Sequence, residues 1–309
     1  MGSLRQTIQD SQCEGDEDWL LATVVILCLY ENGKSGYSPA SAAVHIGAAG
    51  QVFRKRALTK MSAAAKGSYT NHLDKDMQTS SALIFERVYS EAFLYHSMVM
   101  SVHNIQFAPL LDPMLRGIFD TYFGNCALPT SLGLEDWPIL GMHYGIVRSF
   151  YDLLAAIDTS NVAGELGDVS ILEDVIAQLD DWETKISAME DRLHIVLYIS
   201  AAKLLAYHHL PIESPSYQHI AMLIPAELEK CMGALVNIDV TEKAFTRYFN
   251  WPLAIVDRVV QDPQATNLVE QKLHDMARAD PDGRRVFEWV AQGFEKIFRP
   301  RANSRQIDI

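Results

Sequence analysis

The feature that most constrains the fold is a run of twelve residues near the N-terminus, WLLATVVILCLY (residues 19–30), in which only Thr23 is polar. A helix that is apolar on nearly every face is stable only when other helices surround it. The run ends at a polar turn, Glu31-Asn32-Gly33, and an alanine- and glycine-rich segment that ends at Ala57 follows. The small side chains of this second segment let another backbone come close. The sequence therefore predicts a buried N-terminal helical hairpin over residues 19–57, around which the remaining helices pack.

Pairs in which a serine or an aspartate precedes a proline recur along the chain and indicate helix starts. Serine or aspartate accepts hydrogen bonds from the free N–H groups of a first helical turn, and proline at the next position has no N–H to leave unpaired. Helical spacing of apolar residues dominates elsewhere, without a convincing alternating β pattern. We therefore expect an all-α fold. The five pairs are Ser38-Pro39, Asp112-Pro113, Ser214-Pro215, Asp262-Pro263 and Asp280-Pro281.

No linker rich in proline, glycine or serine and no repeat of fixed period divides the 309 residues, of which 49% are hydrophobic. A chain of this length and composition can bury a large core. We expect a single-domain helical array over residues 17–299, built around the N-terminal hairpin. Residues 1–16 are expected to be disordered, and residues 300–309 are expected to form a flexible tail.

The formal net charge of −13 disfavours direct nucleic-acid binding by this chain, because an acidic surface repels phosphate backbones. Two short basic clusters, Arg54-Lys55-Arg56 and Arg299-Pro300-Arg301, are better explained as side chains that neutralise helix dipoles. The longest apolar run is shorter than the roughly 20 residues that span a bilayer, and the polar N-terminus lacks the apolar core of a signal peptide. We expect no membrane association and a location in the nucleus or cytoplasm.

The spacing of metal-ligating residue types predicts no metal site and no cofactor. The four cysteines, Cys13, Cys28, Cys126 and Cys231, share no short spacing, which argues against a zinc cluster and a disulfide scaffold. Histidines on helices bind zinc in pairs three or four residues apart with further ligands nearby, and the ten histidines form no such pair. A histidine within an apolar stripe is more often a hydrogen-bonded core residue.

Two other fragments resemble known motifs only in part. Gly33-Lys34-Ser35 matches the end of a phosphate-binding loop, but Cys28 occupies the position of the glycine that the motif requires. Asp180-Asp181, followed by Glu183, resembles the aspartates with which helical terpene cyclases bind magnesium diphosphate. The position one turn later is not a carboxylate, and the second motif of those enzymes is absent. We interpret this acidic segment as a solvated helix face.

Five polar aromatic residues lie among apolar neighbours and are the catalytic candidates if the chain is an enzyme. Tyr95, His96 and His103 fall on one long predicted helix, and His143 and Tyr144 fall near the start of another. Such groups could orient an apolar substrate and stabilise charge on it. The alternative is that they are buried polar residues paired with backbone groups.

The order of several helix-packing motifs resembles the large helical regulatory domain of fungal zinc-cluster transcription factors. The similarity covers roughly residues 17–298 and implies an all-α regulatory or ligand-sensing domain. The six-cysteine DNA-binding cluster of that family is missing, so the resemblance does not carry DNA binding to this chain. The matching segments are Leu27 to Glu31, His45 to Ala49, Ile171 to Trp182, His194 to Leu210, Trp251 to Ala254 and Asn267 to Met276.

Two hypotheses of function follow from these observations. In the first, the chain is a regulatory helical domain without its own DNA-binding module, tied to fungal secondary metabolism, with a protein partner or a small apolar metabolite as its ligand. In the second, the same helical domain is a repurposed biosynthetic enzyme of a fungal natural-product pathway, a cofactor-free cyclase or pericyclase that acts on an apolar metabolite with the five polar aromatic residues.

Overall fold

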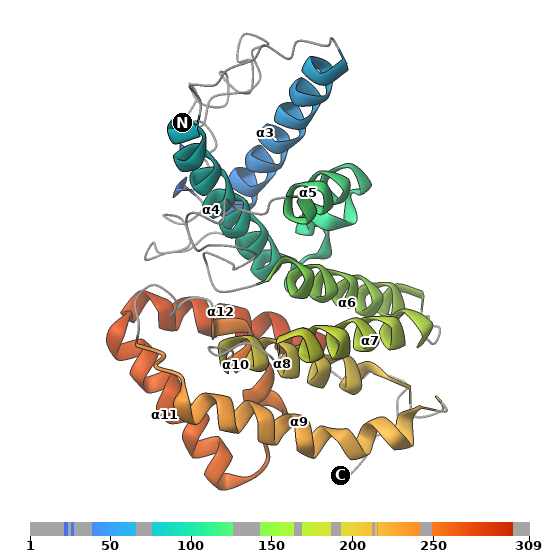
Figure 1. Ribbon diagram of the computed structural model, residues 1–309. Coiled ribbons are helices and arrows are strands. Elements are labelled where there is room, and N and C mark those ends of the chain that lie inside the picture. Colours follow the sequence, from blue (N-terminus) through green and yellow to red (C-terminus); the bar gives the residue numbers. More distant parts are fainter. Residues whose placement is uncertain are drawn as a thin grey trace. The chain divides into compact units, whose positions relative to one another are not determined.

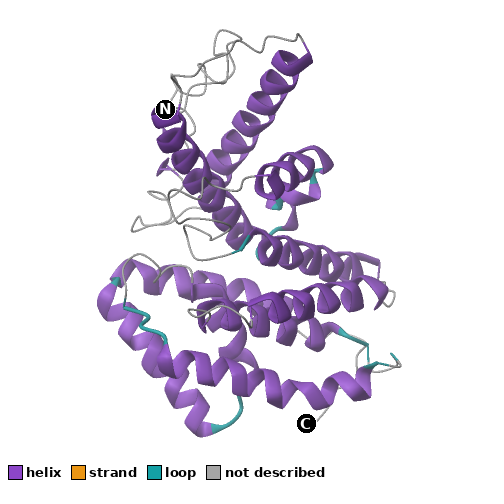
Figure 2. Ribbon diagram, viewed as in Figure 1, coloured by secondary structure: helices purple, strands orange, loops and turns teal. Residues whose placement is uncertain are grey.

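The computed structural model describes residues 22–23, 26–27, 39–65, 76–125, 143–163, 169–186, 193–211, 214, 216–241 and 249–298 (Figure 1). Within these ranges the chain forms ten α-helices and two short 3-10 helices, and no strand (Figure 2). The predicted all-α fold is therefore confirmed. The elements are α3 (Pro39–Ala65), α4 (Asp76–Ser101), η1 (Ile105–Phe107), η2 (Pro109–Leu111), α5 (Pro113–Asn125), α6 (Tyr144–Ala163), α7 (Val169–Ile186), α8 (Leu193–His209), α9 (Tyr217–Asn237), α10 (Asn250–Val259), α11 (Pro263–Ala279) and α12 (Pro281–Ile297).

Contacts between residues divide the chain into two compact units. The first unit holds α3, α4 up to Met100, and α5, and the second holds residues 101–105 together with α6 to α12. Two compact units can belong to one domain, so the single domain over residues 17–299 stays a prediction.

The first unit is built on an aromatic cluster that joins three helices. The Phe53 ring of α3 lies 5.0 Å from the rings of both Phe93 on α4 and Phe119 on α5, measured between centroids. Arg54, next to this cluster, forms an ion pair with Asp112, which precedes α5. The hydrogen bond from Arg54 is the main reason that the pKa of the Asp112 carboxyl is lowered. The pair therefore fixes the start of α5 against α3.

The second half of the predicted N-terminal hairpin is helical, and it is longer than predicted. Helix α3 continues past Ala57 to Ala65, and its buried face includes Ile46, Val52 and Phe53. Most of the apolar first half lies outside the described residues. Its four described positions, 22–23 and 26–27, are helical, but Ile26 is 54% exposed. At these positions the helix is not enclosed on every face, because apolar composition alone does not guarantee that neighbours cover each side.

Local capping rules place most helix starts correctly. Helices α5, α11 and α12 begin at the prolines of three predicted pairs, and α3 begins at Pro39. The carboxylate of Asp262 caps α11, because it accepts a hydrogen bond of 2.9 Å from the N–H of Ala265. The prediction at Ser214-Pro215 was off by a few residues, since α9 begins at Tyr217.

The second unit surrounds α8, which is buried along most of its length from Ile195 to Tyr207. Helix α8 packs against α6, α7, α9 and α10, and α10 packs in turn against α11 and α12. At the centre lies Trp251, whose ring centroid is 4.4 Å from that of Phe150 on α6 and 5.5 Å from that of Tyr198 on α8. None of the helices in the described part of the chain combines the length and the apolarity that crossing a membrane requires.

Candidate functional site

The most unusual feature of the second unit is a charged side chain in the middle of its most buried helix. Lys203 lies within the apolar run of α8, and only 1% of its side chain is exposed. An isolated ammonium group at such a depth is strongly unfavourable, so it requires carboxylates as partners. The neighbouring helices α7 and α9 supply them.

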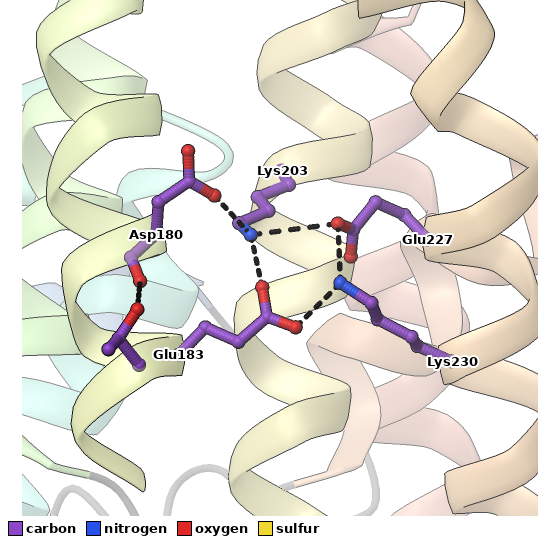
Figure 3. A network of polar contacts seen from close by, with 6 residues as sticks. Asp180, Glu183, Lys203, Glu227 and Lys230 are labelled. Atoms are coloured by element: carbon purple, nitrogen blue, oxygen red, sulfur yellow. Dashed lines mark hydrogen bonds and ion pairs between the residues drawn. The ribbon is translucent and has the colours of Figure 1, made fainter. Parts of the chain in front are cut away.

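Three carboxylates surround the Lys203 ammonium group (Figure 3). From α7, Asp180 approaches it at 2.5 Å and Glu183 accepts a hydrogen bond from it. From α9, the Oε1 atom of Glu227 lies 3.6 Å away. The positions on α7 are three residues apart, which is about one helical turn, so both carboxylates point toward α8.

A second lysine closes this arrangement into a ring. The Nζ atom of Lys230, on α9, lies 2.6 Å from Glu183 and 3.0 Å from Glu227. Lys203, Glu183, Lys230 and Glu227 thus alternate in sign around a closed circuit, and Asp180 adds a fifth charge at its edge (Figure 3). We call these five residues the charge ring. It joins α7, α8 and α9 through ion pairs.

The ring holds Lys203, Lys230 and Glu183 in their charged forms. Burial alone would lower the pKa of Lys203, but hydrogen bonds to Asp180 and Glu183 outweigh it, so the pKa is raised. The same balance raises the pKa of Lys230. Burial would raise the pKa of Glu183, but hydrogen bonds from the two lysines lower it. A catalytic lysine needs a lowered pKa to act as a base or nucleophile, and neither lysine meets that requirement.

Two further groups beside the ring are held in their neutral forms. Burial, assisted by the negative charge of Glu227, raises the pKa of the Tyr207 hydroxyl and of the Cys231 thiol. A thiol is a nucleophile only as the thiolate, so Cys231 is inert at neutral pH. The directions of these pKa shifts suit a structural joint rather than a proton-transfer centre.

The five candidate catalytic residues are divided between the two units. Tyr95 and His96 are neighbours on α4 in the first unit; both are buried, and their rings meet edge to face at 5.3 Å. His103, His143 and Tyr144 belong to the second unit.

His103 is engaged with α12. Its Nε2–H donates to the backbone carbonyl of Trp289 at 2.9 Å, and the two rings stack at a centroid distance of 3.9 Å. Gly293 allows this approach, because a Cβ atom there would lie 2.9 Å from the His103 Nε2 atom. Burial, opposed by this hydrogen bond and reinforced by the charge of Lys296, lowers the pKa of His103 to about 4.

His143 is engaged with α7 instead. Its Nδ1 atom accepts a hydrogen bond of 3.3 Å from the N–H of Gly145, and its ring lies 4.0 Å from the Trp182 ring. Tyr144 is the first residue of α6 and is half-buried. His103 and His143 therefore pack on tryptophans of two different helices, and the role of the five residues as one catalytic set stays a prediction.

The acidic segment on α7 differs in part from its sequence interpretation. Asp181 is exposed and pairs with Lys185, as expected for a solvated face. Asp180 and Glu183 instead turn toward Lys203. The sequence signalled a buried charge in need of a partner, since Lys203 is the only charged residue in the apolar segment LHIVLYISAAKLLAY, but it did not indicate which residues pair with it. Among the described residues, no group of three histidines, cysteines or carboxylates is placed to hold a metal ion.

Comparison of the chain with protein-family models, with curated proteins and with solved structures gives no match.

Proposed function

We propose that this chain is a regulatory helical domain that responds to a bound metabolite or a protein partner and has no DNA-binding module of its own. The observation that carries this proposal is the charge ring. Its ionisable groups pair with one another across three helices, and the pKa shifts of Lys203, Lys230 and Glu183 favour their charged forms. Such a ring serves to hold α7, α8 and α9 in one arrangement, which suits a domain that acts through its conformation rather than through proton transfer.

The net charge of −13 supports action through a partner. A strongly acidic chain binds DNA poorly, so an effect on transcription would require a second protein that reads the DNA. The proposed setting is fungal secondary metabolism, in the nucleus or cytoplasm, as the family resemblance implies.

The enzyme hypothesis gains no specific support from the described residues. The pKa of His103 is too low for a general base at neutral pH, where a catalytic base works best with a pKa near the operating pH.

Deletion of the gene in the source organism tests the proposal, with transcripts and metabolites measured in the same cultures. We expect the transcripts of a biosynthetic gene set to change, and we expect the purified protein to convert none of the pathway's intermediates. Unchanged transcripts together with accumulation of one intermediate would refute the regulatory function and support the enzyme.

A further inference from the structure

The start of helix α10 carries two consecutive polar side chains that are wholly enclosed. Asn250 and Trp251 are both 0% exposed. The Oδ1 and Nδ2 atoms of Asn250 and the Nε1 atom of Trp251 have no hydrogen-bond partner among the residues that the structure describes.

Unpaired polar atoms at this depth are unfavourable. Each buried donor or acceptor without a partner has lost its hydrogen bonds to water and gained none in return, and buried polar groups are therefore paired in nearly all cases. Here three such atoms occur on two adjacent residues at one helix end. We take this concentration as evidence that a ligand supplies the missing partners.

The rings that pack around the start of α10 are aromatic, and the buried residues of α10 are uncharged. Trp251 contacts Phe150 of α6 and stacks on Tyr198 of α8 at an interplanar angle of 16°, and Phe249 stacks on the same tyrosine at a centroid distance of 6.1 Å. The buried residues of α10, from Asn250 to Val256, are all neutral. A charged ligand would lose its hydration here without a counter-charge, so the ligand is expected to be neutral and largely apolar.

We propose that the start of α10 binds a small neutral metabolite that carries an amide or lactam group. One edge of the Asn250 side-chain amide presents a donor beside an acceptor, and an N–H and a C=O on the same edge of a lactam complement both. The indole N–H of Trp251 donates to a further oxygen of the ligand. This inference rests on the proposed ligand-sensing function and names the chemical class of its ligand. Because both side chains are enclosed, the ligand enters while α10 is displaced from its neighbours.

The first test measures ligand-free protein. In Asn250→Leu the unpaired amide is replaced by an apolar group of similar size, so the thermal midpoint of unfolding is expected to stay equal or to rise. Asn237→Leu is the control, because the Asn237 amide donates to the Gly233 carbonyl at 2.9 Å on the exposed end of α9. A lower midpoint for Asn250→Leu than for the control would show that the Asn250 amide is already satisfied, by water or otherwise, and would overturn the proposal.

The second test uses 2-pyridone, a neutral lactam, and N-methyl-2-pyridone, which lacks the N–H donor. We expect 2-pyridone to raise the unfolding midpoint of the full chain, and the N-methyl compound to bind roughly tenfold more weakly because one hydrogen bond is lost. Asn250→Leu should keep its circular dichroism spectrum and lose the response to 2-pyridone. The site would be overturned if about 10 mM 2-pyridone left the unfolding midpoint of the unaltered protein unchanged. It would also be overturned if 2-pyridone shifted the midpoint of Asn250→Leu by the same amount.

These outcomes separate the site from the proposed function. If 2-pyridone binding depends on Asn250 while gene deletion leaves transcripts unchanged, the site stands and the regulatory function falls. If the transcripts change on deletion but neither binding nor stability depends on Asn250 as stated, the regulatory function stands and this ligand site falls.

Discussion

Replacement of Lys203 by methionine tests whether the charge ring holds the second unit together. The substitution keeps an unbranched side chain of similar length in α8 but leaves the surrounding carboxylates without their central cation. Removal of one partner from a buried ion pair costs about 3–5 kcal/mol. The Asp180 side chain is 59% exposed and can be solvated by water, so the loss of its ion pair with Lys203 adds little to the destabilisation. Lys230 still contacts Glu183 and Glu227, so we expect the lower end, about 3 kcal/mol of unfolding free energy.

Urea unfolding followed by far-UV circular dichroism measures this loss. Lys185→Met is the matched control, because Lys185 pairs with Asp181 on the exposed face of α7, and its loss should change the unfolding free energy by no more than about 0.5 kcal/mol. The deficit of Lys203→Met should shrink toward about pH 5, where uncompensated buried carboxylates take up protons. If the unfolding free energy of Lys203→Met lies within about 0.5 kcal/mol of that of the control, the assignment of the ring as a structural joint is refuted.

Two further predictions concern contacts in the second unit. A Cβ atom at Gly145 would overlap the Trp182 indole, so Gly145→Ala should lower the unfolding free energy by about 1–3 kcal/mol. Gly233 on α9 faces open space, so the control Gly233→Ala should raise the unfolding free energy by up to about 1 kcal/mol. An equal effect of the two substitutions in urea titrations would contradict the predicted overlap. The pKa of His103 is about 4 in the folded chain and ordinarily 6.5, so the unfolded chain binds the proton first as pH falls. The unfolding free energy should therefore decrease between pH 6.5 and 4, and His103→Gln should show a shallower decrease; parallel pH profiles would exclude His103 as the cause.

Helix starts could be predicted from the sequence because they depend on residues that are close along the chain. The Asp262 cap needs only Pro263 and the N–H of Ala265, all within one turn. The all-α class follows from the same local regularities. The buried hairpin was harder to predict, because the exposure of Ile26 depends on which elements cover it rather than on its own run of apolar residues.

The charge ring could not be predicted because its partners are distant in sequence. Lys203 and Glu183 are 20 residues apart, and Lys230 and Glu183 are 47 residues apart. Helical periodicity tells which residues of α7 share a face, but it does not tell which helix packs on that face. His103 illustrates the same limit, because its partner Trp289 lies 186 residues further along the chain.

The alternation of sign around the charge ring also selects against misaligned helix pairings. Glu227 and Lys230 are about one helical turn apart on α9, so a slip of α9 by one turn would bring Lys230 opposite Lys203. Two ammonium groups would then meet in an apolar interior, with a penalty that an all-leucine seam would not impose. During folding, the ring therefore favours the native register of α9 over the register that is shifted by one turn. An apolar contact of the same area would allow both registers.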